Sequence, residues 1–171
     1  MSAALFRGVR YTTLLSLALS LINLAYALPA PKSEPVLWVS GNITQSNSNQ
    51  GVVFDEEMLL ALEQGSIMTN NHVVEQIVEY TGPKLVSVLD YVGAEGETLK
   101  VVAWDDYVVT MPIADVEKYG LLLATHEAGK RMTIDDKGPF FIVYPFSENP
   151  ELRNDYYYSL SVWQVKELVI E

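Results

Sequence analysis

The chain has 171 residues, of which 49% are hydrophobic and 19% charged, a composition typical of a globular domain with a substantial core and not of a disordered segment. Its 11 basic and 22 acidic residues give a net charge of −11, which disfavours nucleic acid as a partner because phosphate binding depends on Lys and Arg. The sequence contains no cysteine, which excludes disulfides, thiolate metal sites, iron–sulfur clusters and cysteine nucleophiles within this chain.

Residues 1–27 have the pattern of a secretory signal peptide. Arg7 and Arg10 form its positive start, residues 14–24 an apolar stretch too short to span a bilayer comfortably, and residues 25–27 a small-x-small cleavage site. Beyond this leader, nine basic and 22 acidic residues remain, a net charge of −13. We therefore expect an exported protein that is cleaved near Ala27 and resides in a bacterial periplasm, with an uncleaved membrane anchor as the alternative.

The rest of the chain is predicted to begin with a Pro-rich linker at residues 28–35 and to continue as a single domain over residues 36–171. The elements predicted for its first half are, in order, a strand at 36–39, a polar loop at 42–50, a short helix capped by Asp55 and ended by Gly65, a loop feeding a strand over 67–80, and a helix from Pro83 to Gly93. The second helix is the clearest, because its apolar residues Leu85, Val88, Leu89 and Val92 recur at helical spacing.

The second half is predicted to be mostly strands. Its elements are a hairpin of strands 99–103 and 107–111, a helical turn from Pro112 to Gly120, a buried strand at 121–125, a turn around Gly129, a strand after Lys137-Gly138-Pro139 that ends at Tyr144-Pro145, a loop at 153–159 and a last strand at 162–170. Strands outnumber helices and the connections are short. The predicted fold class is therefore α+β, with a mixed sheet or β-sandwich core.

Several chemistries have little support in the sequence. His72 and His126 stand about fifty residues apart and neither has a ligand partner at metal-binding spacing, so both are interpreted as ordinary loop histidines and no metal site is expected. A Gly-x-Ser-x-Gly hydrolase motif is absent. The pairs Asp105-Asp106 and Asp135-Asp136 have the right groups for acid–base work, but both fall at predicted turns, where Asp is favoured for backbone reasons.

The stretch from Asp135 to Trp163 has a composition suited to a ligand site. It contains aromatic rings, interstrand loops and, in its later part, the single cation Arg153. A protein needs such groups to hold a flat, polar-edged molecule. The alternative is structural, since a run such as Tyr156-Tyr157-Tyr158 is common at the half-buried edge of a sheet.

Five ordered segments carry a resemblance to a known family. They are residues 85–94, the hairpin Trp104–Pro112, residues 122–124, Gly129–Met132 and residues 137–145. Together they resemble the molybdopterin-binding domain of the sulfite oxidase family, and Arg153 with residues 157–159 and 162–164 is similar to a small exported subgroup of it. The resemblance implies a sulfite oxidase-like α+β fold that cradles a pterin.

Enzymes of that family bind molybdenum through the dithiolene of molybdopterin and, in the true oxidases, through one protein cysteine, which this chain lacks. The resemblance thus implies a protein that is not an enzyme and that resembles the periplasmic pterin-binding signalling proteins of the PruR type. Such a protein binds a reduced pterin of the tetrahydropterin type and acts on the periplasmic domain of a membrane-bound enzyme that makes or degrades cyclic di-GMP. Molybdopterin is the less favoured ligand. A phosphate-binding cluster of Lys130, Arg131, Lys137 and Arg153 would instead favour a molybdopterin-dependent oxidoreductase, and a ligand-free exported scaffold is the third possibility.

The resemblance also implies the residues of the pterin site. Trp104 is expected to stack on the ring, and Asp105 or Asp106 to bind its aminopyrimidine edge. The complete predicted site comprises Trp104, Asp105, Asp106, Tyr107, Asn70, Arg153, Tyr157 and Ser159. The chain departs from related sequences at Asp105, where they commonly have Asn, and at about Asn71 or His72, where they have Trp.

Overall fold

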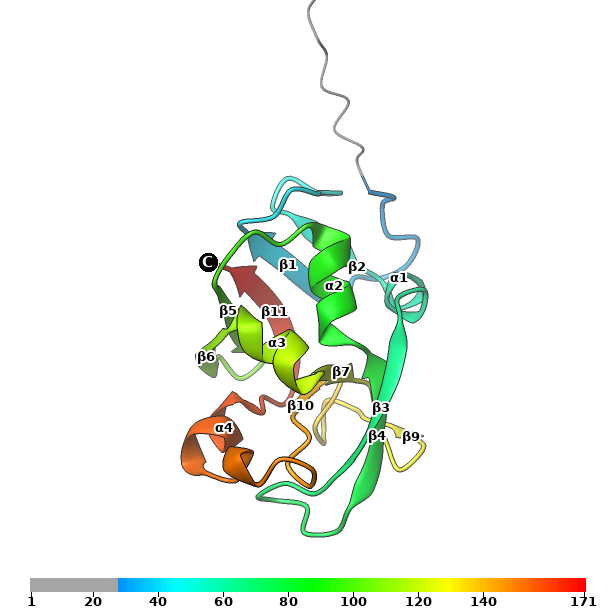
Figure 1. The fold of residues 1–171 in the computed structure, drawn as a ribbon. Coiled ribbons are helices and arrows are strands. Elements are labelled where there is room, and N and C mark those ends of the chain that lie inside the picture. Colours follow the sequence, from blue (N-terminus) through cyan, green and yellow to red (C-terminus); the bar gives the residue numbers. More distant parts are fainter. Residues whose placement is uncertain (1–27) are drawn as a thin grey trace, which may run out of the picture.

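The computed structural model describes residues 28–171, so the predicted leader at residues 1–27 lies outside the described part (Figure 1). The helices and strands are β1 (Leu37–Gly41), β2 (Val52–Phe54), α1 (Glu56–Leu60), β3 (Gln64–Thr69), β4 (Val78–Pro83), α2 (Leu85–Val92), β5 (Thr98–Ala103), β6 (Val108–Pro112), α3 (Ile113–Tyr119), β7 (Leu122–Ala124), β8 (His126–Glu127), β9 (Lys130–Arg131), β10 (Phe141–Val143), the 3-10 helix η1 (Pro150–Leu152), α4 (Asp155–Leu160) and β11 (Val165–Ile170). Within residues 28–171, none of these helices is long and apolar enough to cross a membrane.

The strands form three sheets. The largest has the order β2-β1-β11-β5-β6, and its β1–β11 pair is parallel while its other pairs are antiparallel. A second sheet has the order β3-β4-β8-β9, and β10 pairs with β7 in a third. The mixed α+β architecture predicted from the sequence is confirmed.

The main core lies between the five-stranded sheet and the helices α2 and α3, which lie on the same side of it (Figure 1). On β5, buried and partly exposed residues alternate, as a strand with one covered face requires. Helix α2 buries its apolar stripe of Leu85, Val88, Leu89 and Val92, and Gly93 ends it at φ 63°, a left-handed conformation that glycine adopts without strain.

A smaller apolar cluster joins the second sheet to the β7–β10 pair. Its buried members are Tyr80, Leu122, Ala124, Met132, Phe141 and Val143, and Trp163 packs against it. Strand β4 approaches β7 closely at Gly82, where a Cβ atom would lie 2.5 Å from the Leu123 oxygen.

Three predictions about individual elements are corrected, and one strand was missed. The helix capped by Asp55 ends at Leu60, and Gly65 lies inside β3, opposite Gly82. Pro83 ends β4, so that α2 begins at Leu85. The short strand β2 was not predicted. The region predicted as a loop at 153–159 contains helix α4, whose N-terminal amides donate to the side chain of Asn154.

Candidate ligand-binding site

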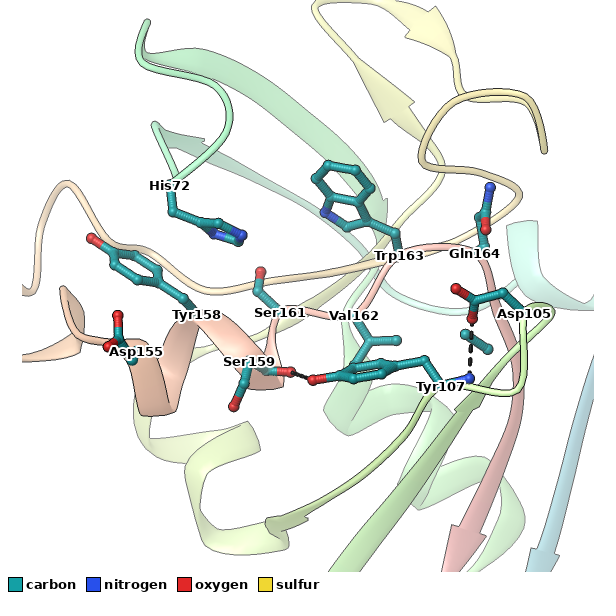
Figure 2. A pocket seen from close by; sticks show the side chains of 11 residues that line it. His72, Asp105, Tyr107, Asp155, Tyr158, Ser159, Ser161, Val162, Trp163 and Gln164 are labelled. Carbon is teal, nitrogen blue, oxygen red and sulfur yellow. Dashed lines mark hydrogen bonds between the residues drawn. The ribbon is translucent and has the colours of Figure 1, made fainter.

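A cavity of about 540 Å³ lies between α4, the β5–β6 hairpin and the loop that joins β3 to β4 (Figure 2). Its lining consists of His72, Ala103, Asp105, Tyr107, Asp155, Tyr158, Ser159, Ser161, Val162, Trp163 and Gln164. The volume falls within the range of small-molecule sites, and the mixture of apolar surface with a few polar groups is typical of them.

The β5–β6 hairpin forms one wall. Its turn closes with Asp106 N–H donating to the Ala103 oxygen at 3.2 Å, and Asp106 takes the left-handed position of the turn at φ 65°. This geometry directs Asp105 and Tyr107 to the cavity (Figure 2). The Tyr107 hydroxyl donates to the Ser159 oxygen at 3.2 Å, which ties the hairpin to α4.

Helix α4 and the His72 loop form the opposite wall. The rings of Tyr158 and His72 lie 5.0 Å apart, centroid to centroid, at an interplanar angle of 37°. Below them the Ser161 hydroxyl donates to the Ile142 oxygen at 2.8 Å, so the end of α4 is anchored to β10. The cavity therefore has an aromatic pair on one side and the Asp105 carboxylate on the other (Figure 2).

Trp163 and Gln164 close the cavity between these walls. Trp163 packs edge-to-face on Phe141 with centroids 6.0 Å apart, and Figure 2 shows its indole nitrogen on the side toward His72. Gln164 has a φ of 51°, and its side-chain amide donates to the Ile134 oxygen at 2.6 Å. A non-glycine residue in this region is strained, and such strain persists only where surrounding contacts enforce it, often at functional sites.

The charged residues of the lining favour a ligand with hydrogen-bond donors. Asp105 and Asp155 are its carboxylates, and none of the lining residues within 28–171 is Lys or Arg. A carboxylate accepts two hydrogen bonds side by side, as the N3–H and 2-amino groups of a pterin require. The lining therefore suits hydrogen-bond donors better than a phosphate group, which needs cations.

The four cations considered for phosphate binding do not gather at this cavity. Arg131 pairs with Glu56, and Lys137 pairs with Glu127 and Asp136. Arg153 donates to the backbone oxygens of Phe146 and Ser147 at 2.7 and 2.9 Å. Nowhere in residues 28–171 do three or more potential metal-ligating side chains cluster.

Of the eight residues predicted for the site, the cavity brings together Asp105, Tyr107 and Ser159. Asp106 shapes the turn beside them. Trp104 does not line this cavity: its ring packs edge-on against Trp38 at 6.1 Å, and the Lys166 ammonium lies 5.0 Å from its centroid.

The remaining predicted residues support the site from outside. Asn70 accepts a hydrogen bond from the Ser147 hydroxyl at 3.0 Å, next to the carbonyls that Arg153 holds. Tyr157 packs between Tyr144 and Tyr119. The pKa of Tyr157 is raised to about 12, mainly by a hydrogen bond with Tyr119 and secondly by burial. Asn70 and Arg153 fix the segment after β10, and Tyr157 fixes the base of α4.

Sequence reasoning missed His72, Tyr158, Trp163 and Gln164, together with Asp155 and Ser161. Two features of the sequence pointed to three of these residues. Tyr158 and Trp163 belong to the aromatic stretch whose composition suited a ligand site, and His72 falls where related sequences have an aromatic residue.

The chain matches no protein-family model and no curated protein sequence. Among solved structures it is similar to the sulfane dehydrogenase SoxCD from Paracoccus pantotrophus, with 18% sequence identity and a TM-score of 0.57. The match covers 84% of this chain and 40% of that chain, so the present chain spans well under half of the dehydrogenase's length. At this identity the similarity concerns the fold, which is sulfite oxidase-like, as the resemblance implied.

One prediction is overturned by this match. The sequence led us to expect a protein that is not an enzyme, yet the solved structure with the same fold is a dehydrogenase. The fold thus gives no ground for setting catalysis aside. The narrower resemblance to signalling proteins of the PruR type finds no support in the match.

Proposed function

We propose that the chain is a pterin-binding protein and that the pterin ring occupies the cavity between α4, the β5–β6 hairpin and the His72 loop. The observation that carries this proposal is the placement of aromatic rings and a carboxylate around one space: His72, Tyr158 and Trp163 on two sides and Asp105 across from them. A pterin has a flat pyrimidine ring with donors along one edge, so it needs both features at once.

In this arrangement Trp163 is the residue that stacks on the ring, and Asp105 accepts from the N3–H and 2-amino groups. The His72–Tyr158 pair closes the far side, and Gln164, whose amide nitrogen is already bound to the Ile134 oxygen, offers its side-chain oxygen. The ligand we favour is a reduced pterin of the tetrahydropterin type, as the sequence resemblance implied, and molybdopterin is less favoured because the lining carboxylates provide no attraction for its phosphate.

Two uses of a bound pterin are proposed, of which the first requires molybdopterin and the second the favoured tetrahydropterin. Similarity of fold to a dehydrogenase favours a role in an oxidoreductase, as the whole protein or as one subunit. The alternative is a periplasmic sensor whose pterin-bound state regulates the periplasmic domain of a membrane-bound cyclic di-GMP enzyme. The net charge of −13 over residues 28–171 suits a docking partner with a basic surface.

The two uses differ in what co-purifies with the protein. The protein is isolated without oxygen and denatured, and the supernatant is analysed for pterin by fluorescence after oxidation and for molybdenum by mass spectrometry. Stoichiometric pterin without molybdenum supports the sensor, pterin with molybdenum supports the oxidoreductase, and absence of both contradicts pterin binding.

A matched pair of tryptophan variants tests the placement of the ligand. Trp163→Ala removes a ring that lines the cavity, whereas Trp104→Ala removes a ring packed on Trp38 outside it. We expect the first variant to lose the pterin and the second to retain it. Loss in Trp104→Ala with retention in Trp163→Ala would move the site to the other face of the hairpin.

A further inference from the structure

An ion cluster around a buried lysine lies beside Trp163. Lys137 is only 7% exposed, and its ammonium is 2.9 Å from Glu127 Oε2 and 3.0 Å from Asp136 Oδ1. Glu127 Oε1 also accepts a hydrogen bond of 2.7 Å from the Tyr80 hydroxyl, which in turn accepts from the Asn71 amide at 3.3 Å. Burying an ammonium is costly unless it is paired, so its presence here calls for a reason.

The ammonium stays charged in this environment. Burial lowers the pKa of Lys137, but hydrogen bonds and charge attraction from Glu127 and Asp136 outweigh burial and raise the pKa above the ordinary lysine value. The Lys137 Nζ lies over the Trp163 ring, 5.7 Å from its centroid. Trp163 lines the cavity and Lys137 does not, so the ammonium approaches the indole from outside the cavity.

A cation held against one side of an indole draws electron density toward itself. The π system of the indole then becomes a better partner for an electron-rich ring and a poorer one for an electron-poor ring. The pyrimidine ring of a tetrahydropterin carries amino donors and is electron-rich, whereas a fully oxidised pterin is a conjugated, electron-poor bicycle.

We propose that Lys137 is a specificity-determining residue that acts through Trp163 and makes the cavity prefer reduced over oxidised pterins. The inference rests on the proposed pterin site. Lys137 is held in this position by its carboxylate partners and by the Gln164 N–H, which donates to the Lys137 backbone oxygen at 2.9 Å. Glu127 and Asp136 bring two negative charges to the single positive charge of the ammonium, so they limit how strongly it polarises the ring.

The test measures the dissociation constants of tetrahydrobiopterin and biopterin, two pterins with the same side chain, by anaerobic calorimetry on the full chain. We expect the wild-type protein to prefer tetrahydrobiopterin and Lys137→Met to reduce that preference by about threefold, the size of a modest cation–π contribution. Lys137→Arg, which keeps the charge, should retain most of the preference. Glu127→Gln removes one of the two negative charges beside the ammonium and should increase the preference for tetrahydrobiopterin.

The ratio of the two constants separates polarisation from mere structural support. A structural role for Lys137 would weaken both ligands equally, and an unchanged ratio in Lys137→Met therefore overturns the inference. If Lys137→Met fails to fold, Glu127→Gln provides the test. An unchanged or smaller preference for tetrahydrobiopterin in that variant also overturns the inference. A wild-type protein that binds neither pterin overturns the pterin site itself and this inference with it.

Discussion

Replacing Asp105 with Asn should weaken pterin binding about tenfold. One oxygen of Asp105 accepts from the Tyr107 N–H at 3.1 Å, and the carboxylate faces the cavity (Figure 2). Hydrogen bonds to charged groups contribute about 1.5–3 kcal/mol, and because Asp105 is exposed, the lower end applies, which corresponds to about tenfold in the dissociation constant. Calorimetric titration with tetrahydrobiopterin measures this directly.

Asp106→Asn is the matched control. It removes the same charge from the adjacent residue, and Asn is favoured at the left-handed φ of 65° that Asp106 adopts. We expect it to change the affinity less than twofold, about the size of a screened surface effect. Equal losses in both variants would show that the total negative charge of the hairpin matters and not a contact of Asp105. An unchanged affinity in Asp105→Asn would refute its assignment to the pterin edge.

Three further predictions concern stability and are measured by urea unfolding. Gly82→Ala should lower the free energy of unfolding by about 2 kcal/mol, because the added Cβ atom would lie 2.5 Å from the Leu123 backbone oxygen in β7. An unchanged urea midpoint would contradict this close packing. The Asp55 carboxylate accepts a hydrogen bond from the Met58 N–H at 2.9 Å, and this bond is the main cause of its lowered pKa. The ionised carboxylate therefore stabilises the folded protein above the unfolded pKa of about 3.9, and this stabilisation is lost as the pH falls through the folded pKa. Asp55→Asn should therefore show a weaker loss of stability on acidification, and parallel pH profiles would refute this. Tyr80→Phe should cost about 1–3 kcal/mol by leaving buried partners unsatisfied, and no loss would show that water replaces the hydroxyl.

The elements that sequence reasoning placed well are those specified by local signals. The spacing of the buried residues of α2 and its ending at Gly93 are properties of nine consecutive residues, Leu85 to Gly93. The same holds for the β5–β6 hairpin, whose short polar tip separates two strands of high β propensity. In both cases the information lies within one element, so no knowledge of the rest of the fold was needed.

The errors occurred where distant parts of the chain decide the structure. Strand β3 has weak strand propensity and contains Gly65, and its conformation depends on pairing with β4. The run Tyr156-Tyr157-Tyr158 favours a strand locally, yet it lies in helix α4, where Tyr157 packs on the distant rings of Tyr119 and Tyr144.

The candidate site depends on such distant contacts even more. Its lining comes from the β3–β4 loop, the hairpin tip and residues 155–164, so no local pattern contains it. Trp104 and Trp163 are similar in sequence terms, and only the packing on Trp38 and Phe141 separates their positions.

The position of β11 has a consequence for how the protein is made. Within the described chain this last strand lies third in the five-stranded sheet, with β1 parallel on one side and β5 antiparallel on the other. While the ribosome is still synthesising residues 165–170, β1 and β5 have no partner between them, and both offer open edges to other chains. The sheet therefore closes only after synthesis has passed Ile170, and until then the nascent chain depends on being kept apart from its neighbours.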